Sequence, residues 1–218
     1  MTGSLERSRR GFLERRNPGL STWLALACVA ALAGCGASRP VLYHSIELPA
    51  HTARPAAADP FPVSLLVGHF TAPHIYREDK LVYRTGSSEL HTYESHRWVE
   101  PPTEILEHLL LGALRDSGRF RSVQAQRSSA RGDYLLRGRL ENFEEVTGSR
   151  ATARLRIEAE LYDSKKGTTV WSQSYSEDEP VQGKGMDAVV DAFQRATGRA
   201  VTGVSAGLAE YFSSHPGP

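Results

Sequence analysis

The stretch ATARLRIEAEL at residues 151–161 alternates small or apolar residues with polar ones at every position. The first set is Ala151, Ala153, Leu155, Ile157, Ala159 and Leu161, and the second is Thr152, Arg154, Arg156, Glu158 and Glu160. Successive side chains of a β-strand point to opposite faces of the sheet, so this alternation predicts a strand with one buried face. The charges on the other face favour an antiparallel sheet that is wetted on one side.

Two further long strands are expected beside this one. Residues 134–146 precede it, and residues 168–176 follow it after the turn Lys165-Lys166-Gly167. Upstream, apolar runs predict shorter strands at residues 41–48, 63–70, 81–85, 90–95 and 121–126. Gly86-Ser87-Ser88 separates two of these runs, which is typical of a β-hairpin. The chain therefore contains enough strands for one large sheet.

Two helices complete the predicted fold. Pro101 and Pro102 suit a first helical turn, and apolar residues then recur at helical spacing until Gly118, a plausible stop. A second helix is expected over residues 185–212, with Gly198, Gly203 and Gly207 inside it. These glycines suit close packing on the helix's own sheet or on a neighbouring subunit. The pattern predicts an α+β fold, a mostly antiparallel mixed sheet backed on one face by two helices.

The N-terminus has the layout of a bacterial lipoprotein signal. Five arginines between Arg7 and Arg16 precede an apolar run of about 14 residues, which is shorter than the roughly 20 that a membrane span needs. The run ends in Leu32-Ala33-Gly34-Cys35. We expect residues 1–34 to be removed, Cys35 to carry acyl chains, residues 35–40 to form a short tether, and residues 41–218 to form one domain. An ordinary signal peptide that happens to contain cysteine is the alternative.

The composition of the remaining chain excludes several classes of function. Removal of residues 1–34 leaves 21 basic and 23 acidic residues, a formal charge of −2, which gives no support for nucleic-acid binding. Cys35 is then the one cysteine left, so no disulfide can form within the chain. The histidines lack metal-ligand spacing and the serines lack a nucleophile-elbow context. We therefore expect no enzyme, no metal and no cofactor beyond the acyl chains on Cys35.

One segment concentrates aromatic and basic residues just before the first helix. It includes Tyr83, Arg84, Tyr93 and Trp98. Aromatic residues with arginine are common anchors of protein interfaces, so we expect these four to contribute to a partner or subunit surface. The alternative is that they pack in the core, with Trp98 fixing the start of the helix.

The same segment carries a family resemblance. The motifs are LVYR at 81–84, LHTY at 90–93, HRWVEPP at 96–102 and LRDSGRF at 114–120 with Val123. In this order they resemble the ABC-type transport auxiliary lipoprotein family, which includes the lipoprotein of the paraquat-inducible operon. The first strand departs from the family's usual Tyr-Tyr-x-Leu pattern because His44 follows Tyr43.

The resemblance implies a fold similar to the N-terminal domain of TolB and a non-enzymatic role in transport. Such proteins accompany MCE-domain lipid transporters, in which an ABC permease and ATPase sit in the inner membrane and MCE proteins form a tunnel across the periplasm. The lipoprotein would dock the tunnel at the outer membrane. By analogy with lipoprotein sorting in enterobacteria, a residue other than aspartate after the cysteine, here Gly36, also implies the outer membrane. A ring of subunits, a homo-oligomer, would suit a tunnel mouth.

A tether of five residues, Gly36 to Pro40, reaches roughly 17 Å and would hold the body close to the bilayer. A regulator of cell-wall synthesis with the same TolB-like fold is the alternative function. A long tether able to cross the cell wall would favour that alternative.

Overall fold

The computed structural model describes residues 40–48, 61–127 and 129–215, and these residues share one core. The strands among them are β1 (Leu42–His44), β2 (Phe61–Thr71), β3 (Lys80–Thr85), β4 (Glu89–Trp98), β5 (Phe120–Ala125), β6 (Tyr134–Val146), β7 (Thr152–Asp163) and β8 (Thr168–Pro180). The helices are the short 3-10 helix η1 (His74–Tyr76), α2 (Pro102–Asp116) and α3 (Met186–Ser214). Residues 1–34 and Cys35 lie outside the described residues, so the predicted signal and anchor remain predictions.

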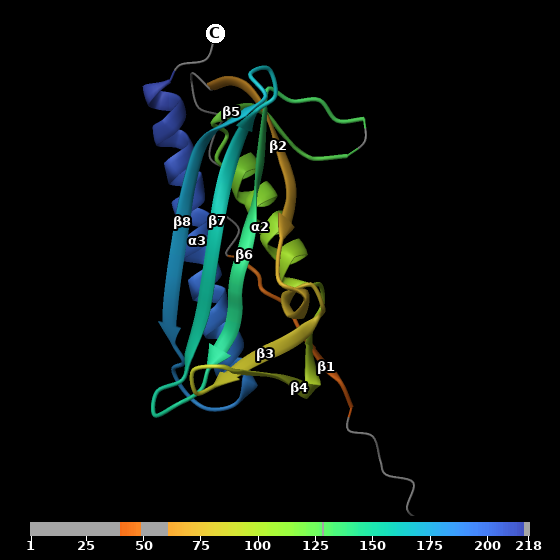
Figure 1. The fold of residues 1–218 in the computed structure, drawn as a ribbon, viewed down its shortest axis with the longest axis vertical. Coiled ribbons are helices and arrows are strands. Elements are labelled where there is room, and N and C mark those ends of the chain that lie inside the picture. The colour runs from red at the N-terminus through yellow and green to blue at the C-terminus, as the bar shows by residue number, and fades with distance from the viewer. Residues whose placement is uncertain (1–39, 49–60, 128, 216–218) are drawn as a thin grey trace, which may run out of the picture. The chain divides into compact units, whose positions relative to one another are not determined.

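The strands form one mixed sheet with both long helices on the same face (Figure 1). The longest ladders are antiparallel and join β6 to β7 and β7 to β8, whereas β1 with β4, β2 with β5, β2 with β6 and β3 with β6 pair in parallel. α2 packs on β2 and β5, and α3 packs on β7 and β8. The α+β class, with two helices backing a mixed sheet, is confirmed.

The apolar faces predicted from the sequence form the core. Ala153, Leu155, Ile157, Ala159 and Leu161 on β7 are all buried, and the intervening residues are partly exposed. On α3, residues that recur every three or four positions from Val189 to Leu208 are buried against the sheet. α2 ends at Asp116, and Gly118 adopts the left-handed conformation with φ +61° that favours glycine after a helix.

Several strand bounds differ from the prediction: β2 and β4 extend beyond the predicted residues 63–70 and 90–95, and the first and last strands also change in length. The first strand covers only Leu42–His44, because its partner β4 ends at Trp98, opposite His44. The chain beyond leaves the sheet, and Ile46 packs into the core. β8 continues past Ser176 to Pro180 because it pairs with β7 along its whole length, up to Thr152.

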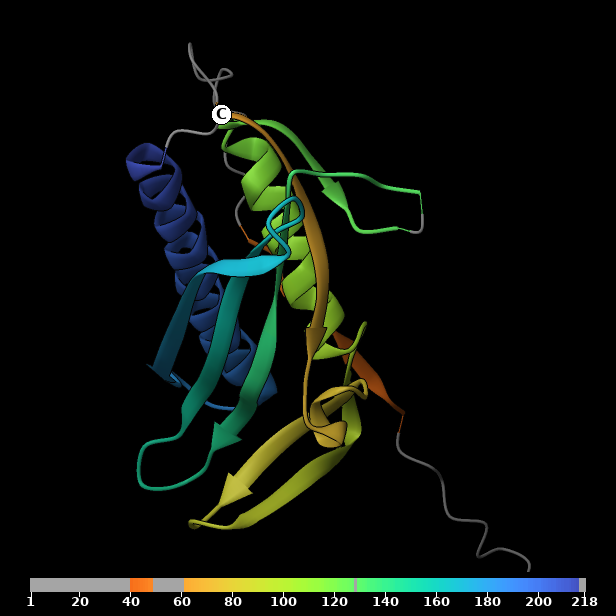
Figure 2. The same ribbon diagram turned by 45° about the horizontal axis from the view of Figure 1, so that its top comes forward.

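One edge of the central strand β6 pairs with two different strands, so the sheet divides there into two branches. Residues 134–139 of β6 pair with β2, whereas only Glu145 and Val146 pair with β3. The β3–β4 hairpin therefore leaves the sheet at one end of the molecule, and β1 adds to the hairpin there (Figure 2). η1 connects the two branches, and its Tyr76 is buried between them.

The glycines of α3 serve its contact with its own sheet. A Cβ atom on Gly203 would lie 2.6 Å from Cε1 of Tyr175 on β8, and one on Gly207 would lie 2.9 Å from Cζ2 of Trp171. The Tyr175 hydroxyl donates a hydrogen bond of 3.0 Å to the Gly203 carbonyl, and burial raises the pKa of Tyr175 to about 12. The first of the two alternatives, close packing on the helix's own sheet, therefore holds for Gly203 and Gly207.

Replacing Gly203 with alanine is expected to destabilise the fold by about 1–3 kcal/mol, because the added methyl group overpacks the Tyr175 contact. Gly112 on α2 is the matched control, since a Cβ atom there meets nothing within 4 Å. Gly112→Ala is expected to stabilise by up to about 1 kcal/mol through helix propensity. Urea unfolding of both variants measures the difference, and equal effects of the two substitutions would contradict the packing described here.

Candidate functional site

A row of aromatic rings runs across the β3–β4 hairpin and onto β1. Tyr83 stacks on His91 with 5.2 Å between ring centroids and contacts Tyr93 at 4.7 Å. Tyr93 meets His96 edge-on at 6.0 Å, and His96 lies 5.2 Å from His44. We call these five residues the hairpin aromatic row. His91 is exposed and the other four are half-buried, so the row presents ring edges and polar atoms to solvent.

A buried carboxylate fastens the other face of the hairpin to β6. Glu144 is fully buried and accepts hydrogen bonds from Nε of Arg84 at 2.6 Å, from Nη2 of Arg84 at 3.0 Å, and from the Tyr76 hydroxyl. Hydrogen bonding to this carboxylate raises the pKa of Arg84 above its ordinary value. Burial, and then the bond to Glu144, raise the pKa of Tyr76. We call Tyr76, Arg84 and Glu144 the hairpin clamp.

The neighbouring carboxylate, that of Glu145, forms its hydrogen bond on the opposite face of the hairpin. Glu145 is nearly buried, and one of its oxygens accepts a hydrogen bond of 2.6 Å from the Tyr93 hydroxyl. Burial, followed by this bond, raises the pKa of Tyr93. Glu144 and Glu145 therefore bond to opposite faces of one hairpin, as neighbours on a strand should.

Trp98 lies in the core and not on a surface. Its side chain is fully buried, and its ring packs edge-on against Phe143 of β6 and Phe193 of α3 at 5.5 and 5.3 Å between centroids. The indole Nε1 has no hydrogen-bond partner among the described residues. The expectation that Trp98 contributes to a partner surface is therefore corrected in favour of core packing, because Phe143 of β6 and Phe193 of α3 both pack against its ring.

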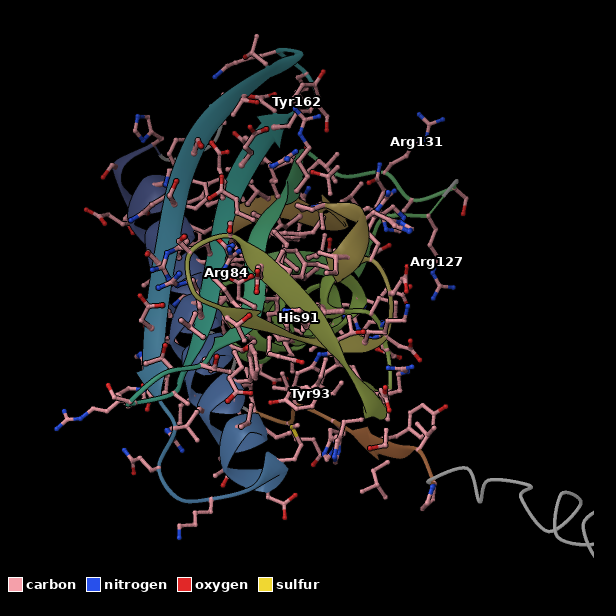
Figure 3. All side chains as sticks on the ribbon, turned by 60° about the horizontal axis from the view of Figure 1, so that its bottom comes forward. Arg84, His91, Tyr93, Arg127, Arg131 and Tyr162 are labelled. Atoms are coloured by element: carbon pink, nitrogen blue, oxygen red, sulfur yellow. The ribbon has the colours of Figure 1, made fainter. Side chains whose placement is uncertain are left out.

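The other three predicted residues share the hairpin but make different contacts, and Figure 3 shows Arg84 and Tyr93 on it. Tyr83 and Tyr93 lie in the aromatic row on one face, and Arg84 lies in the clamp on the other. The sequence did not reveal the clamp, since Glu144 is 60 residues from Arg84 and 68 from Tyr76. The available signal was the adjacent pair Glu144 and Glu145 in a predicted strand, where the two side chains must take opposite faces.

A groove of about 1320 Å³ lies between α3 and the C-terminal end of α2. Small residues of α3, including Gly198, Ser205 and Ala206, line it together with Leu48. Two of the three arginines that line it are engaged by carboxylates of β8: Arg195 bonds to Glu179, and Arg199 bonds to both Glu177 and Glu179. The hairpin, with its gathered aromatic and charged side chains, is therefore the better candidate site.

Within the described ranges, no group of three or more His, Cys, Asp or Glu side chains is placed to hold a metal ion. None of the helices in that part of the chain is long and apolar enough to cross a membrane.

The contact between His44 and His96 predicts a pH-dependent attachment of β1. Nε2 of His44 lies 2.9 Å from Nδ1 of His96, and burial followed by the charge of His96 lowers the pKa of His44, while Asp187 opposes the shift. As the pH falls, His44 is therefore protonated in the unfolded chain before it is protonated in the folded protein. The stability due to neutral His44 is complete above about pH 6.5 and is lost progressively as the pH falls from there through the lowered folded value.

We expect lower protection factors, that is, amide exchange corrected for its intrinsic dependence on pH, in β1 and in residues 96–99 under mildly acidic conditions than at neutral pH. The amide of Val99, which donates to the His44 carbonyl at 3.0 Å, is the most direct reporter. The variant His44→Gln cannot titrate and should lose most of this pH dependence. An unchanged dependence in that variant would contradict the assignment to His44.

The fold and the hairpin define an α+β domain in which a helix-backed mixed sheet carries a separate aromatic hairpin at one end. The sequence matches the family of the ABC-type transport auxiliary lipoprotein component over residues 44–205, and the chain belongs to this family. A search of curated proteins finds no significant match.

Solved structures share the fold. A Xanthomonas campestris protein of the family DUF330 is 24% identical with a TM-score of 0.70, covering 80% of this chain and 99% of its own. A second crystal structure, of an uncharacterized protein, is 14% identical with a TM-score of 0.62, covering 78% and 99%. The PelC dodecamer of Paraburkholderia phytofirmans is 17% identical, covers 69% and 92%, and has a TM-score of 0.44, too low to bear on the assembly of this chain.

Proposed function

We propose that this protein is a lipid-anchored auxiliary component of an MCE-type ABC lipid transporter, which docks the periplasmic MCE tunnel at the outer membrane. The observation that carries the proposal is the family match over residues 44–205, which includes the hairpin, the clamp and most of α3. Its partners are an MCE-domain protein with its ABC permease and ATPase, and the bilayer through acyl chains on Cys35. The role is one of attachment and not of catalysis.

The position of β1 supports docking close to the bilayer. Cleavage before Cys35 leaves five residues, Gly36 to Pro40, between the anchor and the domain, which reach roughly 17 Å. β1 pairs with β4, so the tether joins the body at the hairpin end. The end of a tunnel that reaches the membrane would therefore lie level with the hairpin.

We place the partner contact on the exposed rim of the hairpin aromatic row, at Tyr83, His91 and Tyr93. Aromatic rings with polar tips are frequent anchors of interfaces. Arg84 supports this surface from behind, since its guanidinium is engaged by Glu144. A ring of several copies, each presenting one hairpin, would surround a tunnel mouth.

A genetic test separates this role from regulation of cell-wall synthesis. Deletion of this gene, of the MCE gene, and of both is expected to give the same sensitivity to detergents, since all three strains lack one transport route. The double deletion should be no worse than either single deletion. Sensitivity to cell-wall antibiotics that adds to the effect of the MCE deletion would contradict the proposal and favour the regulator.

A further inference from the structure

The large apolar side chains that remain exposed among the described residues all lie at β1 and just after its partner strand. Val41, Leu42 and Tyr43 are 44%, 53% and 62% exposed, and Val99 is 54% exposed. The Val99 amide bonds to the His44 carbonyl at 3.0 Å, so Val99 lies beside the end of β1, and the other three residues precede that point along the same sheet edge. We call them the β1 patch. Exposed apolar side chains that follow one sheet edge indicate contact with something less polar than water.

We propose that the β1 patch rests on the lipid bilayer, at the level of the headgroups, and fixes the orientation of the anchored body. This inference rests on the proposed attachment through Cys35. It adds that the body has a defined membrane-facing end and does not swing freely on its tether.

The short length of chain between Cys35 and the β1 patch is the reason for choosing the bilayer as its contact. Cleavage before Cys35 places the acylated residue only eight positions from Tyr43, a span of roughly 28 Å when fully extended. α3, with 29 residues, is about 44 Å long, so the tether is short compared with the body. The β1 patch is therefore the exposed apolar surface that the anchor holds nearest to the bilayer.

The unpaired backbone groups of β1 determine how deep the patch can lie in the bilayer. β1 ends the sheet, so its outer backbone groups have no strand partner among the described residues. Unpaired backbone groups are excluded from the hydrocarbon core, where water cannot satisfy them. At the headgroup level they can bond to water and phosphates, and tyrosine is enriched there because its ring is apolar and its hydroxyl is polar. Leu42 and Tyr43 project to opposite faces of the strand, so the contact is made along the edge.

The test uses the acylated full-length product, purified from membranes and reconstituted into vesicles of phosphatidylethanolamine and phosphatidylglycerol. A cysteine is introduced at Leu42 or Tyr43 and labelled with the environment-sensitive dye NBD, while the acylated Cys35 thiol cannot react. Ser164→Cys in the exposed β7–β8 turn is the matched control, because that turn lies at the opposite end from the hairpin (Figure 1). Flotation with the vesicles is measured first.

We expect a blue shift of NBD emission at positions 42 and 43, and quenching by lipids spin-labelled near the headgroup, with neither effect at position 164. Vesicle flotation with water-exposed dye at 42 and 43 would overturn this inference and leave the anchor intact. Failure to float would reject the anchor itself and this inference with it. A blue shift of equal size in the soluble Cys35→Ser protein without vesicles would show that another copy of the chain covers the patch, which also overturns it.

Discussion

Arg84→Ala is expected to destabilise the folded body by about 3–5 kcal/mol, the cost typical of breaking a buried ion pair from one side. The variant leaves the Glu144 carboxylate, which is fully buried, without its cationic partner. The β3–β4 hairpin has only two residues, Tyr83 and Arg84, in backbone register with β6, so it should lose its attachment to the sheet first. Urea unfolding measures the loss, and amide exchange locates it.

Two variants make this prediction specific. Arg137 forms an ion pair with Glu160 on the exposed face of the sheet, so Arg137→Ala should cost less than about 1 kcal/mol. Glu144→Gln removes the buried charge but keeps an acceptor for Tyr76, so adding it to Arg84→Ala should recover part of the lost stability. A loss for Arg84→Ala as small as that for Arg137→Ala would contradict the role of the clamp.

Cys35→Ser is expected to release the protein from the membrane into the soluble periplasm and to abolish its function. Several acyl chains bind a bilayer with about 0.8 kcal/mol per buried methylene, whereas the four residues of the β1 patch offer no comparable attachment. Separation of soluble, inner-membrane and outer-membrane fractions, followed by immunoblotting, measures the distribution. The wild type should be found with the outer membrane.

Ser38→Ala is the matched control for this experiment, because it changes the tether three residues after the predicted lipidation site and keeps Cys35 itself. This variant should fractionate as the wild type does. A wild-type distribution for Cys35→Ser would reject the anchor and support the alternative that residues 1–34 are an ordinary signal peptide.

The local parts of the fold could be predicted because their periodicity is long. The alternation over residues 151–161 fits only a strand and the spacing in α3 fits only a helix. The apolar face predicted for each element is the buried one. The length of β1 could not be predicted, because it depends on where β4 ends. The glycines of α3 have a clear role only once Tyr175 and Trp171 of β8 are seen against them.

The site was less predictable because its contacts join distant parts of the chain. Composition pointed to the right segment, since Tyr83, Arg84 and Tyr93 do share one hairpin. It could not separate a surface residue from a core residue, and Trp98 belongs to the core because Phe143 and Phe193 converge on it from another strand and from a helix. The role of Glu144 could not be predicted, because Tyr76 and Arg84, which bond to it, are distant in the sequence and come together only in the fold.

The most direct test of the docking role is purification of the protein from native membranes in mild detergent through a C-terminal tag, with mass spectrometry of the proteins that accompany it. The docking role predicts recovery of an MCE-domain protein together with its ABC permease and ATPase, and loss of all three with the Cys35→Ser variant. Recovery of cell-wall synthases without any MCE-domain protein would contradict it.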